Sequence, residues 1–302
     1  MAGCYRRAMN TGVMKWQHGE TAYTIHGDLT SGKVPLMLAH GGPGFTSHSM
    51  NVIARYVEAT GRSAITYDQV GCGASTHLQD KPTDFWQISL FVEEFRLLVE
   101  HLGIADNFAL LGHSWGGLLA AEIAITRPQG LKALILSSAL ADTDTWEVEA
   151  RRLALEMPTE FSEPLIRHED AGTIDSDEYA VAIAEFYRRH LIRIPAPPEI
   201  QTAIEESGKD QTVYSAMWGH SELSCTGNLK HHVVSDRLSA INVPTQIFSG
   251  HFDESTALSN QSYLTGIKGS KWEVFAESAH MTYVEEAAKY QRLLNDFLDR
   301  TL

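Results

Sequence analysis

Residues 112–117 read Gly-His-Ser-Trp-Gly-Gly and lie between two segments of different pattern. The apolar run at 108–111 predicts a buried strand, and residues 118–126 predict a helix. A G-x-S-x-G sequence between a strand and a helix is the context of a nucleophile elbow, a tight turn that lifts its serine above the sheet edge. This position predicts Ser114 as an attacking nucleophile, whereas the same five residues elsewhere would indicate only an ordinary turn.

Strand and helix patterns alternate on both sides of this elbow. Such alternation is typical of a parallel sheet with helices on both faces. Residues 21–26 alternate like an edge strand. The other predicted strands are 35–39, 63–67, 131–136, 245–249 and 272–275, and the predicted helices are 50–59, 88–102 and a closing helix over 290–298.

The alternation is interrupted once. Between Ala141 and Ser239 strand signals are lacking and helix-favouring charged segments take their place, such as 178–193, which ends before Pro195. We therefore predict an α/β-hydrolase fold, with a mostly parallel central sheet and an inserted helical cap. The core domain would comprise residues 1–140 and 240–302, and the cap residues 141–239.

Composition restricts the class of partner. The formal net charge of -14 over 302 residues argues against a nucleic-acid or anionic membrane surface, which needs clustered Lys and Arg. Behind Arg6 and Arg7 there is no apolar run, and no stretch is long enough to span a membrane. Cys4, Cys72 and Cys225 are too few and too distant for a disulfide framework. We expect a soluble, unsecreted, cytoplasmic protein.

A serine nucleophile needs a base and an acid that orients the base, in the chain order Ser, acid, His. His280 follows the last predicted strand in a short loop and is the predicted base, with His251 as the rival. Asp253 follows the strand 245–249 and is the predicted acid. The adjacent Glu254 is the alternative acid.

Two backbone N–H groups must stabilise the oxyanion. One is predicted from Trp115, the residue after the nucleophile, and the other from Gly42 in the loop His40-Gly41-Gly42-Pro43-Gly44. Small residues let the backbone approach the developing charge. His40 is expected to hold this loop by hydrogen bonding rather than to transfer protons.

The neighbouring His231 and His232 could suggest a metal site. No third ligand stands at a suitable spacing, so a metal site is not predicted. No organic cofactor is implied either.

Three motifs together carry a family resemblance: His40-Gly41-Gly42-Pro43-Gly44, the elbow at 112–117, and Asp68-Gln69-Val70-Gly71-Cys72-Gly73. The chain resembles the proline iminopeptidase family from about residue 21 to its C-terminus. Within that family it is most similar to the tricorn-interacting aminopeptidase and the amino-acid amidases.

The resemblance implies that carboxylates near the cap bind the free α-ammonium of the substrate. Met217-Trp218-Gly219-His220-Ser221-Glu222-Leu223 resembles the family segment that carries an amine-binding glutamate, which corresponds to Glu222. Glu254 resembles a second such glutamate, and Trp218 is expected at the pocket beside Glu222. Without the resemblance, both glutamates would be interpreted as solvated surface residues.

Three positions differ from the family pattern: Ala74, His220 and Leu223 replace its usual arginine, proline and phenylalanine. These differences affect substrate preference rather than the catalytic residues. The leading interpretation is an aminopeptidase or amidase that removes an N-terminal proline or other small or apolar residue through an acyl-enzyme. The alternative is an esterase, lactonase or tailoring hydrolase of small-molecule metabolism. A binding protein without catalysis is disfavoured because every catalytic position is filled.

Overall fold

The computed structural model describes residues 10–302, in which the strands form an eight-stranded sheet in the order β1-β2-β4-β3-β5-β6-β7-β8. β2 pairs antiparallel with β1 and β4, and from β4 to β8 all neighbouring strands are parallel. The predicted mostly parallel sheet is thus confirmed. The strands are β1 Asn10–Trp16, β2 Gly19–His26, β3 Leu36–Ala39, β4 Ala64–Tyr67, β5 Phe108–His113, β6 Leu131–Ser137, β7 Thr245–Gly250 and β8 Lys271–Phe275.

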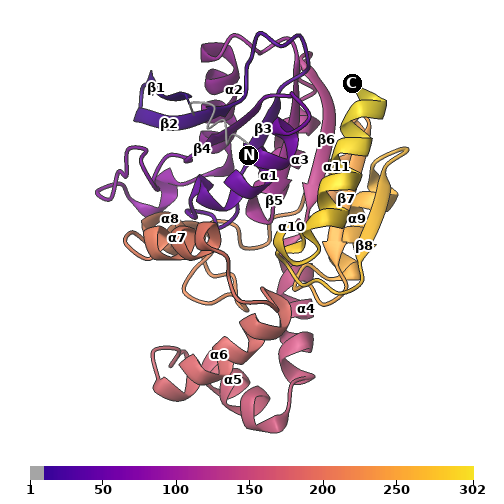
Figure 1. Ribbon diagram of the computed structural model, residues 1–302. Coiled ribbons are helices and arrows are strands. Elements are labelled where there is room, and N and C mark those ends of the chain that lie inside the picture. The colour runs from indigo at the N-terminus through magenta and orange to yellow at the C-terminus, as the bar shows by residue number, and fades with distance from the viewer. Residues whose placement is uncertain (1–9) are drawn as a thin grey trace, which may run out of the picture.

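Helices cover both faces of the sheet (Figure 1). One hydrophobic cluster joins α2 and α3 to the sheet side chains that include Met37 and Leu110. A second cluster joins α1 and α11 to Leu38 and Leu111 on the other face. Because side chains alternate along a strand, each buried strand contributes to both clusters. The helices of this core are α1 Asn51–Glu58, α2 Ile88–His101, α3 Trp115–Ile125, α9 Ala257–Gly266, α10 Thr282–Glu285 and α11 Ala287–Thr301, with 3₁₀ turns η1 Ser47–Met50 and η2 Thr83–Phe85.

The prediction of residues 21–26 as an edge strand is wrong in one respect. These residues lie in β2, but β1 pairs along its outer side and is itself the edge of the sheet. In β1 only Met14 is buried, so this strand lacks the alternation by which a half-buried strand is recognised. Cys4, Arg6 and Arg7 lie outside the described residues.

The segment from Ala141 to Ser239 is described throughout and contains no strand, only two isolated bridges. Figure 1 shows α5 and α6 as a pair that projects away from the sheet, whereas α7 and α8 lie nearer to it. The division into core and cap domains stays a prediction, which this helical composition supports. The segment contains α4 Thr143–Leu155, α5 Thr159–Ala171, α6 Asp177–His190, α7 Pro198–Ser207 and α8 Thr212–Met217, and the 3₁₀ helix η3 Ser235–Ala240 crosses its C-terminal boundary.

The C-terminal end of α6 is joined to loops of the core by backbone hydrogen bonds. The carbonyl of His190 accepts the N–H groups of Glu254 and His280, both at 3.3 Å. The carbonyl of Leu191 accepts the N–H of Met281 at 3.2 Å. The inserted segment therefore meets the core at the two loops in which the predicted acid and base lie.

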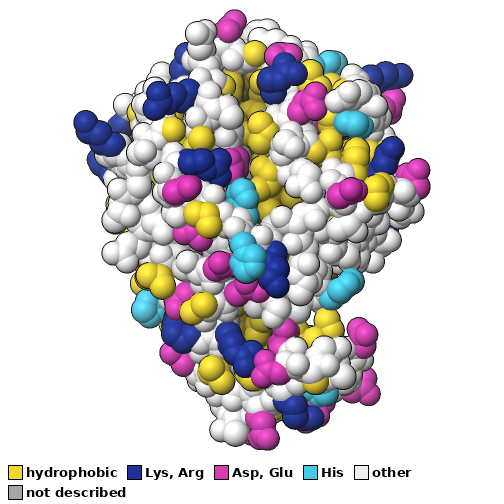
Figure 2. Space-filling view, turned by 180° about the vertical axis from the view of Figure 1, so that it is seen from behind, with side chains coloured by type: hydrophobic (Ala, Val, Ile, Leu, Met, Phe, Trp, Pro, Cys, Tyr) yellow, Lys and Arg dark blue, Asp and Glu magenta, His cyan; other side chains and the backbone are white. Residues whose placement is uncertain are grey.

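On the face drawn in Figure 2, Lys and Arg side chains lie scattered among acidic ones. In residues 10–302 no helix combines the length and the apolar character needed to cross a bilayer.

Candidate active site

Ser114 lies at the junction of β5 and α3, as the elbow motif predicts. Its φ is +57°, a left-handed conformation that is uncommon for a residue with a side chain. A Cβ on Gly112 would overlap the carbonyl of Gly116, and a Cβ on Gly116 would overlap that of Ala39. The flanking glycines are therefore required by close backbone approach, which leaves the Ser114 side chain at the end of the sheet.

A cavity of about 480 Å³ opens at this end of the sheet. Ser114 and His280 both line it, together with Gly41 and Gly42. Ser114 is partly accessible, whereas His280 is almost fully buried. A volume of this size lies within the range of about 300–1,000 Å³ that is typical of small-molecule sites.

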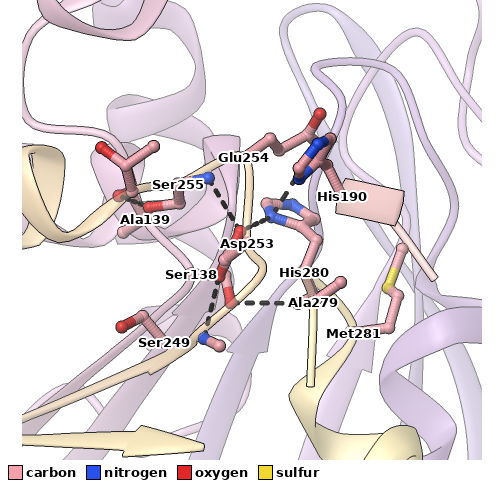
Figure 3. Close-up of polar contacts among 12 residues, drawn as sticks. Ser138, Ala139, His190, Ser249, Asp253, Glu254, Ser255, Ala279, His280 and Met281 are labelled. Carbon is pink, nitrogen blue, oxygen red and sulfur yellow. Dashed lines mark hydrogen bonds and ion pairs between the residues drawn. The ribbon is translucent and has the colours of Figure 1, made fainter. Parts of the chain in front are cut away.

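Asp253 lies beside His280, in the loop after β7 (Figure 3). His280 Nδ1 is 2.8 Å from Asp253 Oδ1, and both side chains are buried. The same oxygen accepts the N–H of Ser255 at 2.8 Å, and Oδ2 accepts that of Gly250 at 3.2 Å. These backbone donors hold the carboxylate in one orientation toward the imidazole.

Three further groups hold the backbone and ring of His280. Ser138 Oγ donates to the His280 carbonyl at 3.0 Å, and His113 Nε2 lies 3.1 Å from the same oxygen. Burial lowers the pKa of His113 to about 3, so its ring is neutral and its Nε2–H can donate. The Trp146 ring packs edge-on against His280, with 6.1 Å between ring centroids.

The two rival residues of the sequence prediction are less well placed. Glu254 Oε1 is 3.8 Å from His280 Nδ1, farther than the 2.8 Å of Asp253, and in Figure 3 its side chain extends toward His190. His251 does not line the cavity, and its ring packs against Phe252. Geometry therefore favours Asp253 and His280 over both rivals.

Glu222 and Glu254 both line the cavity, although one comes from the inserted segment and the other from the core. Glu222 Oε2 accepts a hydrogen bond from Tyr214 at 2.9 Å. Glu254 is buried, and its Oε2 has no hydrogen-bond partner among the described residues. A buried carboxylate oxygen without a hydrogen-bond partner favours a cation nearby.

The electrostatics of these two carboxylates are unusual. Burial raises the pKa of Glu222. Burial, and then the nearby charges of Glu222 and Asp253, raise the pKa of Glu254 well above its ordinary value. Loss of hydration and like-charge repulsion both disfavour the ionised forms. A bound cation would relieve both effects.

Trp218 does not line the cavity, contrary to the expectation from sequence. Its indole N–H donates to the Ser221 carbonyl at 2.8 Å, and its ring packs edge-on against Trp146. Since Trp146 in turn contacts His280, Trp218 supports the site from behind. The side chain turns inward because its neighbours in this loop bury the indole and satisfy its donor.

His40 holds the glycine-rich loop as expected. Its Nε2 accepts the N–H of Gln69 at 3.0 Å, and Gln69 Nε2 donates to the His40 carbonyl at 3.1 Å. A Cβ on Gly41 would come within 3.1 Å of the Ser114 Cβ, so the loop passes close to the serine. Gly42 adopts φ +116°, which favours glycine.

The paired histidines of the sequence analysis each bind a carboxylate. His231 Nδ1 lies 2.8 Å from Asp144, and His232 Nε2 lies 2.7 Å from Glu122. Glu122 also binds Arg237. Across residues 10–302, no cluster of three or more His, Cys, Asp or Glu side chains has the arrangement of a metal site.

Sequence reasoning missed several residues of the cavity wall. Tyr187 and Tyr214 lie beside the carboxylates, and Ile200 and Ile204 project from α7. The four-residue spacing of the two isoleucines indicated a shared helix face. No pattern in the sequence indicated that this face borders the serine.

Comparison with known proteins places this geometry in a family. Residues 34–287 match the family described as alpha/beta hydrolase fold. The chain is 36% identical to the proline iminopeptidase of Heyndrickxia coagulans, with 90% of this chain and 93% of that protein covered. It is 38% identical to the proline iminopeptidase of Clostridium botulinum, with 96% and 98% covered. The chain belongs to the proline iminopeptidase family of α/β-hydrolases.

Solved structures agree with this family assignment. The crystal structure of VinJ has a TM-score of 0.94 at 37% identity, with 97% of this chain and 99% of that chain covered. The proline iminopeptidase of Mycobacterium smegmatis has a TM-score of 0.90 at 36% identity, with 97% and 98% covered. The α/β-hydrolase fold predicted from the sequence is confirmed, and the protein is a hydrolase.

Proposed function

We propose that this protein is a serine aminopeptidase that removes an N-terminal proline, or another small or apolar residue, from a peptide or amide. Ser114, His280 and Asp253 would act as nucleophile, base and acid, and residues 141–239 as the cap over them. The family relationship supports the reaction class, and the carboxylates of the cavity support the recognition of a free amine.

The proposed reaction has two steps. His280 Nε2, the ring nitrogen not bonded to Asp253, takes the Ser114 proton as Oγ attacks the substrate carbonyl. The backbone N–H groups of Gly42 and Trp115 stabilise the oxyanion, and imidazolium protonates the departing amine. Water, activated by the same imidazole, then hydrolyses the acyl-enzyme and restores Ser114. Asp253 keeps the ring in the required tautomer throughout.

One observation carries the proposal for the substrate amine: Glu222 and Glu254 line the cavity that Ser114 lines. A substrate α-ammonium placed between them would neutralise two carboxylates that otherwise repel one another. N-acetylation removes that positive charge. Breaking a buried ion pair costs about 3–5 kcal/mol, so an acetylated substrate should react at least about a hundredfold more slowly in kcat/KM.

The test compares L-prolyl and N-acetyl-L-prolyl anilides on the parent and on Glu222→Gln. The parent should prefer the free amine, and Glu222→Gln should lose most of this preference by slowing on the free amine alone. Glu178→Gln is the matched control, because this glutamate is exposed on α6 and does not line the cavity. It should behave as the parent does.

Equal rates on free and acetylated anilides in the parent would contradict the aminopeptidase proposal. Faster hydrolysis of simple acyl esters than of either anilide would then favour the esterase alternative.

A cytoplasmic setting is also part of the proposal. Cys72 and Cys225 are buried free thiols, which is compatible with a reducing compartment. The other proposed partners are a small molecule or short peptide, with neither nucleic acid nor membrane involved.

A further inference from the structure

The cavity wall carries two chemically different groups of side chains. The acidic group consists of Glu222 and Glu254 with the phenols of Tyr187 and Tyr214. The negative charges of both carboxylates raise the pKa of both tyrosines, in addition to the effect of burial, which places the four side chains near one another. This group is suited to bind the ammonium of the substrate rather than its other parts.

The apolar group consists of Leu191, Ile192, Ile200, Ile204 and Met281. Ile200 is fully buried and belongs to one hydrophobic cluster with Met281, against which Leu191 and Ile192 pack. Ile204 follows Ile200 by one helical turn on α7, lines the cavity and is 49% exposed. The cavity therefore has an aliphatic wall that the binding of an amine does not use.

The position of α7 is fixed by contacts outside the cavity. Arg55 on α1 and Glu199 on α7 form an ion pair at 2.6 Å. The helix packs beside η1, which follows the glycine-rich loop at His40 to Gly44. The aliphatic wall thus lies next to the loop proposed to hold the oxyanion.

We infer, on the basis of the proposed function, that the apolar group binds the leaving group and that the preferred substrate releases a bulky apolar amine. The carbonyl carbon attacked by Ser114 has two substituents. One is the acyl portion, whose ammonium occupies the acidic group. The other is the leaving nitrogen with its substituent, which must extend along the remaining wall.

The size and exposure of the wall support this inference. Release of ammonia or of a small polar residue would leave the half-exposed Ile204 and the partly exposed Leu191 and Ile192 in water. An alkyl or aryl substituent would cover them and gain the free energy of removing apolar surface from water. A cavity of about 480 Å³ has room for such a substituent beside a prolyl group.

The test uses L-prolyl n-alkylamides from methyl to hexyl, because these leaving amines have nearly the same basicity and differ mainly in apolar area. A fully buried methylene contributes about fourfold. At this partly open wall, each added methylene should raise kcat/KM by about twofold. A chain of hexyl length with ether oxygens in place of two methylenes should lose most of that gain.

Ile204→Asn should flatten the dependence on chain length, because it should lower kcat/KM on the hexylamide more than on the methylamide. Ile204→Trp should narrow the cavity beside the apolar group and lower the rate on the hexylamide more than on the methylamide. Val181→Asn is the matched control, since this valine is 62% exposed on α6 and does not line the cavity. This variant should keep the parent's dependence of kcat/KM on alkyl chain length.

Rates independent of alkyl length in the parent, or the same dependence in Ile204→Asn as in the parent, would overturn the inference. A rise with the acyl chain of ethyl esters, but not with the amine, would place the acyl portion at the wall and overturn it too. The two proposals fail separately. If the parent shows no preference for the free amine but its rates still rise with alkyl length, only the proposed function is contradicted. If the parent prefers the free amine but its rates do not depend on alkyl length, only the inference about the leaving group is contradicted.

Discussion

Gln69 and His40 exchange two hydrogen bonds, one from the Gln69 backbone N–H to His40 Nε2 at 3.0 Å and one from Gln69 Nε2 to the His40 carbonyl at 3.1 Å. The Gln69 Oε1 atom also accepts the indole N–H of Trp115 at 2.9 Å. A single buried side chain therefore joins the glycine-rich loop to the residue after Ser114, and these two segments carry the two proposed oxyanion donors.

Gln69→Leu should lower kcat by about 10–100-fold, somewhat less than the loss of a whole oxyanion donor. The substitution leaves the His40 carbonyl and the Trp115 indole N–H without partners, so both backbone segments can shift. KM for a free-amine substrate should change little, because Glu222 and Glu254 are untouched. Steady-state kinetics on prolyl anilide would measure this split.

Thermal unfolding should show a moderate loss of stability in Gln69→Leu, since each unpaired buried polar group costs about 1–3 kcal/mol. Gln129→Leu, in the exposed loop between α3 and β6, is the control and should match the parent in both measurements. A fall in stability with unchanged kcat would show that Gln69 is structural only.

Ser114→Ala should abolish turnover and leave the melting temperature nearly unchanged. The substitution removes one oxygen from a turn whose shape depends on the close approach of Gly112 and Gly116. A fluorophosphonate probe should label the parent and leave the variant unlabelled, as intact-mass measurement would show. Labelling of the variant at another residue would show that Ser114 is not the nucleophile.

Asp253→Asn and Glu254→Gln should separate two roles of adjacent carboxylates. Asp253 lies 2.8 Å from His280 Nδ1, so Asp253→Asn should reduce kcat by about 10⁴-fold on free and acetylated substrates alike. Glu254→Gln should slow only the free-amine substrate. Kinetics on the two prolyl anilides would distinguish these outcomes. A larger loss from Glu254→Gln on the acetylated substrate would make Glu254 the acid.

Glu94 should make the stability of the fold depend on pH. Burial raises its pKa to about 8, above the ordinary carboxyl value near 4.3 of the unfolded chain. The folded state therefore holds a proton that the unfolded state releases, so stability is full below about pH 4 and declines as pH rises toward about 8.

Glu94→Gln should remove this dependence. Its amide oxygen can still accept from Thr21 Oγ1 and the Val70 N–H, and its NH₂ replaces the unpartnered Oε2. The variant should melt near the parent temperature at pH 5 and above it at pH 9, as calorimetry would show. The same difference in melting temperature between variant and parent at pH 5 and at pH 9 would contradict a buried neutral carboxyl. Glu100→Gln, partly exposed on α2, is the control.

Much of the fold could be predicted because its signals are local. The run at 108–111, the glycines around Ser114 and the helical spacing at 88–102 each specify a strand, turn or helix within a few residues. The order of serine, acid and histidine along the chain then selected Asp253 and His280, since parallel strands end at one edge of the sheet. The edge strand at 10–16 was missed because its side chains alternate poorly.

The tertiary structure alone decided which side chains share the cavity. Glu222, from the loop after α8, and Glu254, from the loop after β7, line one cavity, an arrangement that no local pattern expresses. Trp218 turns behind the cavity, and Ile204 lines it, because of how the inserted segment packs over the core. The sequence by itself determined most of the secondary structure of the core and the catalytic candidates, whereas the long-range packing of two separate segments determined the surroundings of the substrate.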